Sequence, residues 1–141
     1  MKLSLNWIKK YVDLPVGLTP DELAYDLTMR TVEVEEVVDL SLNYRDIVVG
    51  KVVSVEDHLN ANSLKVCKVD VGRDKIYQIV CGGTNVAEGQ LVIVALPGSR
   101  VRWHGEGDLV TLEETKLRGE ISQGMICAAN ELMLDDIFPN Q

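Results

Sequence analysis

The spacing of hydrophobic residues changes along the chain and separates a helical beginning from a β-rich remainder. In the first segment Leu5, Ile8 and Val12 recur three or four residues apart after Ser4, which predicts a helix capped by that serine. From about residue 44 the apolar positions instead alternate with polar ones or form short unbroken runs, as in β-strands. The chain is therefore predicted to be mainly β, with a small α/β segment in front.

A second helix is predicted over about residues 20–29, because its start signal is unusually complete. Thr19 is placed to cap the helix, Pro20 takes the first helical position, and Glu22 lies where a capping box needs an acidic residue. The stretch TVEVEEVVDL at residues 31–40 then alternates valine with other residues, which predicts a β-strand. Two helices and one strand bury too little apolar surface to fold alone.

Five strands are predicted in the remainder of the chain, separated by turn residues. They cover residues 47–56, 64–71, 76–81, 91–96 and 124–127. Gly50, inside the first of them, indicates a bulge or a sharp bend, as tightly coiled barrels need. Five strands with a long, turn-rich connection before the last one favour a five-stranded OB-fold barrel, and a β-sandwich fragment is the alternative.

Two domains follow from these elements. We expect residues 1–40 to be a helical segment that belongs to a split neighbouring domain, because they lack a core of their own. We expect residues 41–141 to form the OB-fold domain.

Composition places the chain among globular proteins and gives it an acidic balance. Its 141 residues are 46% hydrophobic and 26% charged, and no apolar run reaches the length of a membrane span or of a secretory signal. We therefore expect a cytoplasmic protein. The net charge of −8 counts against strong nucleic-acid binding, because phosphate contacts need Lys and Arg. Between Lys51 and Gly105, however, seven basic residues exceed five acidic ones, which predicts a modest basic face.

The sequence contains no recognisable catalytic or metal-binding motif. Cys67, Cys81 and Cys127 are odd in number and lack C-x-x-C spacing, and His58 and His104 have no ligand-spaced partners. No phosphate-binding loop and no nucleophile with a plausible base can be identified. We predict buried free thiols at the first two cysteines, and neither a metal, a cofactor nor an active centre in this chain.

Polar stretches around the predicted barrel supply candidate contacts for nucleic acid. In HLNANSLKVCKVDVG, a loop with amide and hydroxyl groups leads into a strand whose Lys65 is expected at the mouth of the barrel, within reach of a phosphate. OB barrels bind through one sheet face and its bordering loops. The candidate contacts are Asn60, Asn62, Ser63, Lys65, Arg100, Arg102, Lys116 and Arg118. For each of them, a turn-forming or solvated role is the alternative.

Aromatic side chains, on which single-stranded nucleic acids stack, are few in the barrel region. Apart from Phe138 near the end, only Tyr77 and Trp103 are present. Trp103 stands in GSRVRWHGEG, among basic residues and glycines. Two interpretations stay open for it, a ligand contact at the rim or a cap on the open end of the barrel.

Several motifs together resemble one known family. The stretches are MKLSLNWIKKYVDLP, HLNANSLKVCKVDVG, QIVCGGTNV, VALPGS and KLRGEISQGMICAANEL, and they are similar to the amino-terminal part of bacterial phenylalanyl-tRNA synthetase β subunits. The barrel also resembles the EMAP-II-like tRNA-binding module. The resemblance implies weak electrostatic contact with tRNA-Phe and an α-subunit partner in an (αβ)2 heterotetramer. For the whole enzyme it implies ATP and Mg²⁺, with the aminoacylation centre in the α subunit.

The first loop departs from the family pattern H-P-N-A-D-K-L. Leu59 replaces the proline, Asn62 the aspartate and Ser63 the lysine, which removes one candidate phosphate contact. Three interpretations follow: a tRNA-binding module of the ligase, a structural module of the same ligase with little RNA contact, or a free-standing tRNA-binding protein. The last requires the reading frame to stop near Gln141, and we expect the frame to continue.

Overall fold

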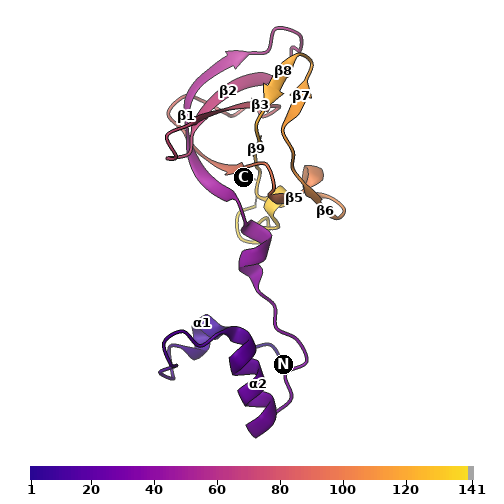
Figure 1. The fold of residues 1–141 in the computed structure, drawn as a ribbon. Helices are drawn as coiled ribbons and strands as arrows, with labels where there is room; N and C mark the ends of the chain where they lie inside the picture. The colour runs from indigo at the N-terminus through magenta and orange to yellow at the C-terminus, as the bar shows by residue number, and fades with distance from the viewer. Residues whose placement is uncertain (140–141) are drawn as a thin grey trace. The chain divides into compact units, whose positions relative to one another are not determined.

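Residues 1–139 are described by a computed structural model, in which the chain falls into two units, Met1–Asp39 and Leu40–Gln141 (Figure 1). The first unit contains the helices α1 (Leu5–Ile8) and α2 (Pro20–Arg30). None of the helices within the described residues is long and apolar enough to cross a membrane.

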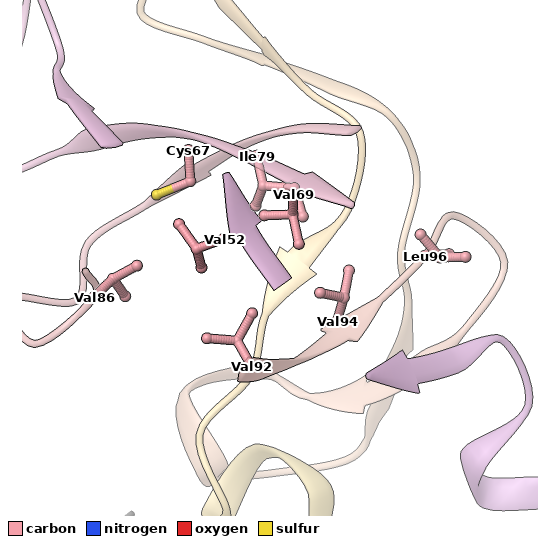
Figure 2. Close-up of a cluster of buried hydrophobic side chains, with 8 residues drawn as sticks. All are labelled: Val52, Cys67, Val69, Ile79, Val86, Val92, Val94 and Leu96. Carbon is pink, nitrogen blue, oxygen red and sulfur yellow. The ribbon is translucent and has the colours of Figure 1, made fainter. Parts of the chain in front are cut away.

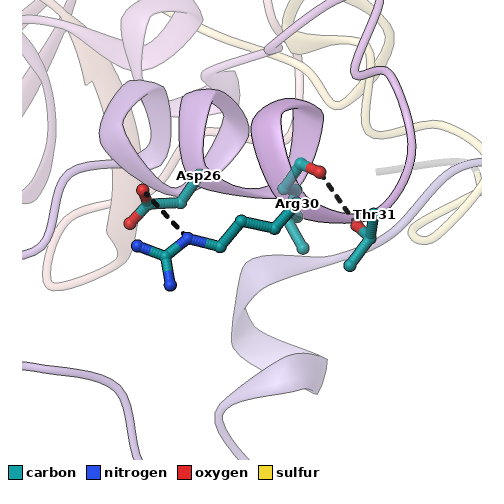
Figure 3. A network of polar contacts seen from close by, with 4 residues as sticks. Asp26, Arg30 and Thr31 are labelled. Carbon is teal, nitrogen blue, oxygen red and sulfur yellow. Dashed lines mark hydrogen bonds and ion pairs between the residues drawn. The ribbon is translucent and has the colours of Figure 1, made fainter.

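Helix α2 begins as predicted from the sequence. The Glu22 N–H donates to Thr19 Oγ1 at 3.2 Å, and the Thr19 N–H donates to Glu22 Oε2 at 2.9 Å, which completes the capping box. At the other end, the Thr31 hydroxyl donates to the carbonyl of Leu27, and Arg30 lies 3.9 Å from Asp26 (Figure 3). Local side-chain contacts therefore define both ends of this helix.

Two expectations for the first unit are wrong. Helix α1 has four residues, and only hydrogen-bonded turns continue to Val12, whose N–H donates to Ile8 O at 3.1 Å. The stretch predicted as a strand, residues 31–40, contains no strand. The reasons are the same: no described residue of this unit is buried. A short helix needs a packed face, and a strand needs a neighbour for its N–H and C=O groups.

The second unit is a β-barrel preceded by the 3₁₀ helix η1 (Leu40–Tyr44). Its main sheet is antiparallel with the order β3-β2-β1-β4-β9 (Figure 1). The strands are β1 (Ile47–Asp57), β2 (Lys65–Asp70), β3 (Ile76–Cys81), β4 (Leu91–Ala95) and β9 (Met125–Ile126). All five predicted strands are therefore present, with ends that differ by at most one residue.

The edges of this sheet, β3 and the segment leading into β9, meet and nearly close the barrel. The Gln123 N–H donates to Gln78 O at 2.8 Å, and the Val80 N–H donates to Ser122 Oγ at 3.0 Å. The side-chain amide of Gln78 donates to Ile121 O at 2.9 Å. These bonds satisfy β3 groups that an open sheet would leave unpaired. The five-stranded OB-fold barrel predicted from the sequence is confirmed.

The long connection between β4 and β9 contains two hairpins that the sequence pattern did not predict. One pairs β5 (Arg100–Arg102) with β6 (Leu109–Thr111), and the other pairs β7 (Thr115–Leu117) with β8 (Glu120–Ser122). Each strand has three residues, too few to show a period of two. The helix η2 (Trp103–Gly105) lies between β5 and β6, and the helix η3 (Asn130–Leu132) follows β9.

Two clusters of buried side chains form the core of the barrel unit. The larger one lies within the main sheet and contains Val52, Cys67, Val69, Ile79, Val86, Val92, Val94 and Leu96 (Figure 2). The smaller one contains Ala95, Val101, Leu112 and Leu132, and the Tyr44 hydroxyl next to it donates to Leu132 O at 3.2 Å. Because β5, η1 and η3 all contribute, this second cluster fills the end of the barrel where β1 begins.

Gly50 is needed for close packing rather than for a bulge. The register shift of β1 against β2 falls between Val52 and Ser54, two residues after the predicted position. A Cβ at residue 50 would lie 2.6 Å from Val69 Cγ1 and 3.1 Å from Val94 Cγ2. The glycine therefore lets β1 cross the interior side chains of its neighbours at short range.

We expect Gly50→Ala to lower the free energy of unfolding by about 1–3 kcal/mol, because the added methyl group overpacks the core. Urea unfolding followed by circular dichroism measures the change. Gly82→Ala is the matched control, since a Cβ there meets only Leu64 Cδ2 at 3.7 Å. Equal unfolding midpoints for the two variants would contradict the packing role of Gly50.

The thiols of the barrel unit are free, and two of them are chemically protected. Burial raises the pKa of Cys67 to about 11 and that of Cys127 to about 12. Cys67 is fully buried, as predicted, whereas Cys81 is half-buried. A thiol reacts as its thiolate, so both raised values lower reactivity at neutral pH.

We expect iodoacetamide to modify Cys67 far more slowly in the native chain than in urea. At pH 8 a thiol with a pKa of about 11 holds about 100-fold less thiolate than one at the ordinary 9.0, and burial also blocks access. Mass spectrometry of tryptic peptides over time measures the rates, and labelling should accelerate as the pH rises toward 11. Equal rates in buffer and urea would show that the thiol is accessible.

Candidate nucleic-acid interface

Two segments that are far apart in the sequence meet at the end of the barrel where β1 finishes. The ring nitrogen Nε2 of His58 lies 3.1 Å from Leu117 O, and the Asn60 side-chain amide donates to Arg118 O at 3.2 Å. We call these four residues the latch. Figure 1 shows the β7–β8 hairpin beside the loop that follows β1. The latch therefore fixes the hairpin turn relative to the 58–64 loop.

His58 is buried, and both of its ring nitrogens have partners. The Asn60 backbone N–H donates to Nδ1 at 3.0 Å, so Nδ1 acts as the acceptor. Nε2 therefore carries the proton and donates to Leu117 O. With 4% of the residue exposed, water cannot easily replace either bond. His58 therefore links two loops. The sequence pattern did not reveal this role, because the partner Leu117 is 59 residues away.

The hairpin turn that the latch holds has an unusual backbone. Arg118 adopts φ +49° and Gly119 adopts φ +110°, as in a two-residue type I′ turn, where both central residues have positive φ. Such a conformation costs a non-glycine residue about 1 kcal/mol. The carbonyls of Leu117 and Arg118 accept hydrogen bonds from His58 and Asn60, while the side chain of Arg118 is exposed. The fold thus presents an arginine at a defined point on the surface.

The structure divides the predicted contact residues into two groups at opposite ends of the barrel. The latch-end group is exposed and contains Asn60, Asn62, Ser63, Lys116 and Arg118. Arg100 and Arg102 lie on β5, which contacts η1 at the beginning of β1. The two ends are separated by the 11 residues of β1, about 35 Å along the strand. The eight residues therefore do not form one site.

Lys65 lies near the latch end and is engaged inside the protein. Its ammonium group donates to Thr84 O at 3.3 Å and to Val86 O at 3.4 Å. Lys65 is half-buried, and it pairs with Cys81 across β2 and β3. In this arrangement its charge holds the 82–87 loop against the barrel instead of pointing to solvent.

Carboxylates near the hairpin are occupied by neutral amides. Gln78 Nε2 donates to Glu120 Oε2 at 3.0 Å, and Gln123 Nε2 donates to Glu114 Oε2 at 3.0 Å. Within residues 1–139, no carboxylate forms an ion pair with any of the exposed or half-exposed cations of the two groups, Arg100, Arg102, Lys116 and Arg118. Their charges are therefore available to a ligand such as phosphate.

Trp103 does not cap the barrel. The second cluster fills that end with Val101, Leu112 and Leu132, whereas Trp103 is 50% exposed. In the described part of the chain, no group of three or more His, Cys, Asp or Glu is arranged to hold a metal ion. The surface is thus suited to contacts with a polyanion, through cations, amides and hydroxyl groups.

We expect His58→Ala to lower the free energy of unfolding by roughly 2–4 kcal/mol, because it leaves the Asn60 N–H and Leu117 O without partners and opens a cavity. Amide hydrogen exchange over residues 115–122 should accelerate as well. Urea unfolding and exchange mass spectrometry measure both effects. Leu59→Ala, at a neighbouring side chain that is 91% exposed, should change stability by less than about 0.5 kcal/mol. If both variants behave alike, the latch does not stabilise this end of the barrel.

Among solved structures, an RNA ligase of Naegleria gruberi has a similar fold. The TM-score is 0.51 with 15% sequence identity over 69% of this chain and 31% of the ligase chain. At this identity the likeness concerns the fold alone.

Curated proteins give a much closer match in sequence. Phenylalanine–tRNA ligase β subunits of Latilactobacillus sakei and Symbiobacterium thermophilum are 44% and 46% identical to this chain over 100% and 96% of its length. The chain spans only 17% and 14% of those proteins. The family described as a putative tRNA binding domain matches residues 47–138, which are the barrel. The chain therefore belongs to the putative tRNA binding domain family and matches the N-terminal region of phenylalanine–tRNA ligase β subunits.

Proposed function

We propose that the barrel binds tRNA through its latch end, as the N-terminal module of a phenylalanine–tRNA ligase β subunit. The observation that supports this most strongly is the latch, which holds on a strained turn an exposed arginine that forms no ion pair within residues 1–139. Backbone strain in a non-glycine residue is retained where the surrounding structure enforces it, often at functional positions. The family description points to the same ligand.

The proposed contact is weak and largely electrostatic. Lys116 and Arg118 meet phosphate groups, while Asn62 and Ser63 offer amide and hydroxyl groups to the sugar-phosphate backbone. Two cations on a chain with a net charge of −8 give a small number of phosphate contacts. The module therefore positions tRNA, and it adds no catalytic group of its own.

The activity belongs to the longer polypeptide that the curated relatives represent. We propose that the chain acts in aminoacylation of tRNA-Phe in the cytoplasm, within an (αβ)2 heterotetramer that uses ATP and Mg²⁺. Support comes from the curated relatives, which are named as β subunits of this ligase.

The first unit is proposed to complete a neighbouring domain formed with another segment of that polypeptide. No described residue of Met1–Asp39 is buried, and the unit exposes large apolar side chains. Among them are Trp7, Tyr11, Tyr25 and Met29, each more than half exposed. A segment of this kind gains its stability when a partner covers these side chains.

A structural role in assembly of the ligase is the second candidate. The outer face of the sheet exposes Val49 (63%) and Leu91 (69%), and Val49 pairs with the partly exposed Ile93 across β1 and β4. This apolar face lies away from the latch and could be covered by another part of the β subunit. Such a role requires no RNA contact.

We expect Arg118→Ala and Lys116→Ala each to weaken tRNA binding several-fold at low salt. Each loss removes one phosphate contact, so the slope of log K against log salt should decrease in magnitude by roughly 0.7–0.9. Fluorescence anisotropy of end-labelled tRNA, measured from 20 to about 200 mM salt, provides both the affinity and the slope.

Arg73→Ala is the matched control, since it removes one exposed cation from the β2–β3 turn at the other end of β2. If this variant changes affinity and slope as much as Arg118→Ala does, binding depends on total charge and not on the latch end. Unchanged tRNA affinity in all three variants would favour the assembly role.

A further inference from the structure

We propose that Trp103 is a stacking platform for an unpaired base of the bound RNA, at the end of the barrel opposite the latch. This inference rests on the proposed tRNA-binding function and adds a second contact to it. Its starting observation is an indole that is half exposed, two residues after the fully buried Val101. Exposed aromatic rings bind bases of any sequence, because every base offers a flat π-face.

The backbone on both sides of Trp103 is anchored. β5 pairs with β6, with Arg102 opposite Leu109, and Val101 is fully buried in the second cluster. Gly105 packs so tightly against Asn130 that a Cβ at residue 105 would collide with the asparagine side chain. A platform that is already fixed loses little conformational entropy when a ligand binds.

The indole of Trp103 has a ring contact with the next residue, His104. Trp103 and His104 form an edge-to-face pair with 5.0 Å between ring centroids and 73° between ring planes. His104 adopts φ +54°, a left-handed conformation that is uncommon for residues other than glycine. With this backbone conformation, the His104 ring lies edge-to-face against the indole.

Two cations precede Trp103 along the chain, on β5. Arg100 is exposed and Arg102 is half-buried, and they alternate with buried Val101 along β5, so both lie on the side of the strand away from the core. The buried Nε of Arg102 has no hydrogen-bond partner within the described residues. A buried Nε cannot reach a ligand, so the exposed Arg100 is the better placed of the two to bind phosphate oxygens.

Acidic residues in the same loop limit the electrostatic part of this contact. Glu106 and Asp108 are exposed, so the two arginines and these two carboxylates balance the charge of residues 100–108. A contact with phosphate alone would be weak there. Base stacking, which depends little on salt, is therefore the interaction that this end of the barrel can provide.

Tryptophan fluorescence reports directly on such a contact. The chain has two tryptophans, so Trp7→Phe leaves Trp103 as the single reporter. This variant is titrated with tRNA, with a single-stranded oligonucleotide of about 10 nucleotides, which suits the site size of an OB fold, and with heparin. We expect quenching by tRNA and by the oligonucleotide, whereas heparin, a polyanion without bases, should leave the fluorescence unchanged.

Substitutions of Trp103 separate stacking from simple apolar contact. We expect Trp103→Ala to weaken tRNA binding about 10-fold with an unchanged salt slope, and Trp103→Phe to retain most of the affinity. Trp103→Leu keeps an apolar side chain but removes the π-face, so it should bind like the alanine variant. Thermal unfolding of each variant shows whether the fold is intact. Where the alanine substitution destabilises the fold, the phenylalanine variant keeps the test valid.

The outcomes distinguish this inference from the proposed function. If labelled tRNA binds by anisotropy while Trp103 fluorescence stays constant and Trp103→Ala binds as the parent does, the stacking inference is wrong and tRNA binding stands. Wild-type affinity in Trp103→Leu would also overturn stacking, in favour of an apolar contact. If no tRNA binds at low salt, the proposed function is wrong and the inference falls with it.

Discussion

The barrel depends on hydrogen bonds that join β3 to the segment before β9 without a regular ladder. A backbone N–H buried without a partner costs about 1–3 kcal/mol, so each edge group of β3 needs an acceptor or donor. Ser122 Oγ and the backbone N–H of Gln123 supply them, and the Gln78 side chain of β3 donates to Ile121 O in return. Residues 97–123 must therefore return to β3 in one register. This requirement determines where the two hairpins of that connection lie.

The same connection brings the candidate binding groups to the surface. By returning to β3, it carries the β7–β8 turn to His58 and Asn60 and leaves Trp103 at the other end of β1. Neutral amides, rather than cations, bind the carboxylates of Glu114 and Glu120. Barrel closure and exposure of unpaired cations are thus two results of one arrangement of side chains.

Features with local causes could be predicted from the sequence, and features with distant causes could not. The capping box of Thr19 and Glu22 and all five main strands follow from neighbouring residues. The partner of His58 is 59 residues away, so no local pattern reveals the latch. Residues 31–40 alternate like a strand but have no neighbouring strand in their unit. Contact residues could be identified by type, whereas their division between two ends depends on the path of β1.

The unpaired arginines sit on a molecule with a net charge of −8. At physiological salt, charges interact over about 8 Å, so a distant polyanion encounters an acidic protein, and only a touching one senses individual guanidinium groups. Such a surface captures RNA poorly from dilute solution. In the proposed role, it would contribute once a covalently linked neighbour already holds the RNA, because tethering raises the effective concentration of the second site into the millimolar range. Such a module would add residence time to a complex that other domains initiate.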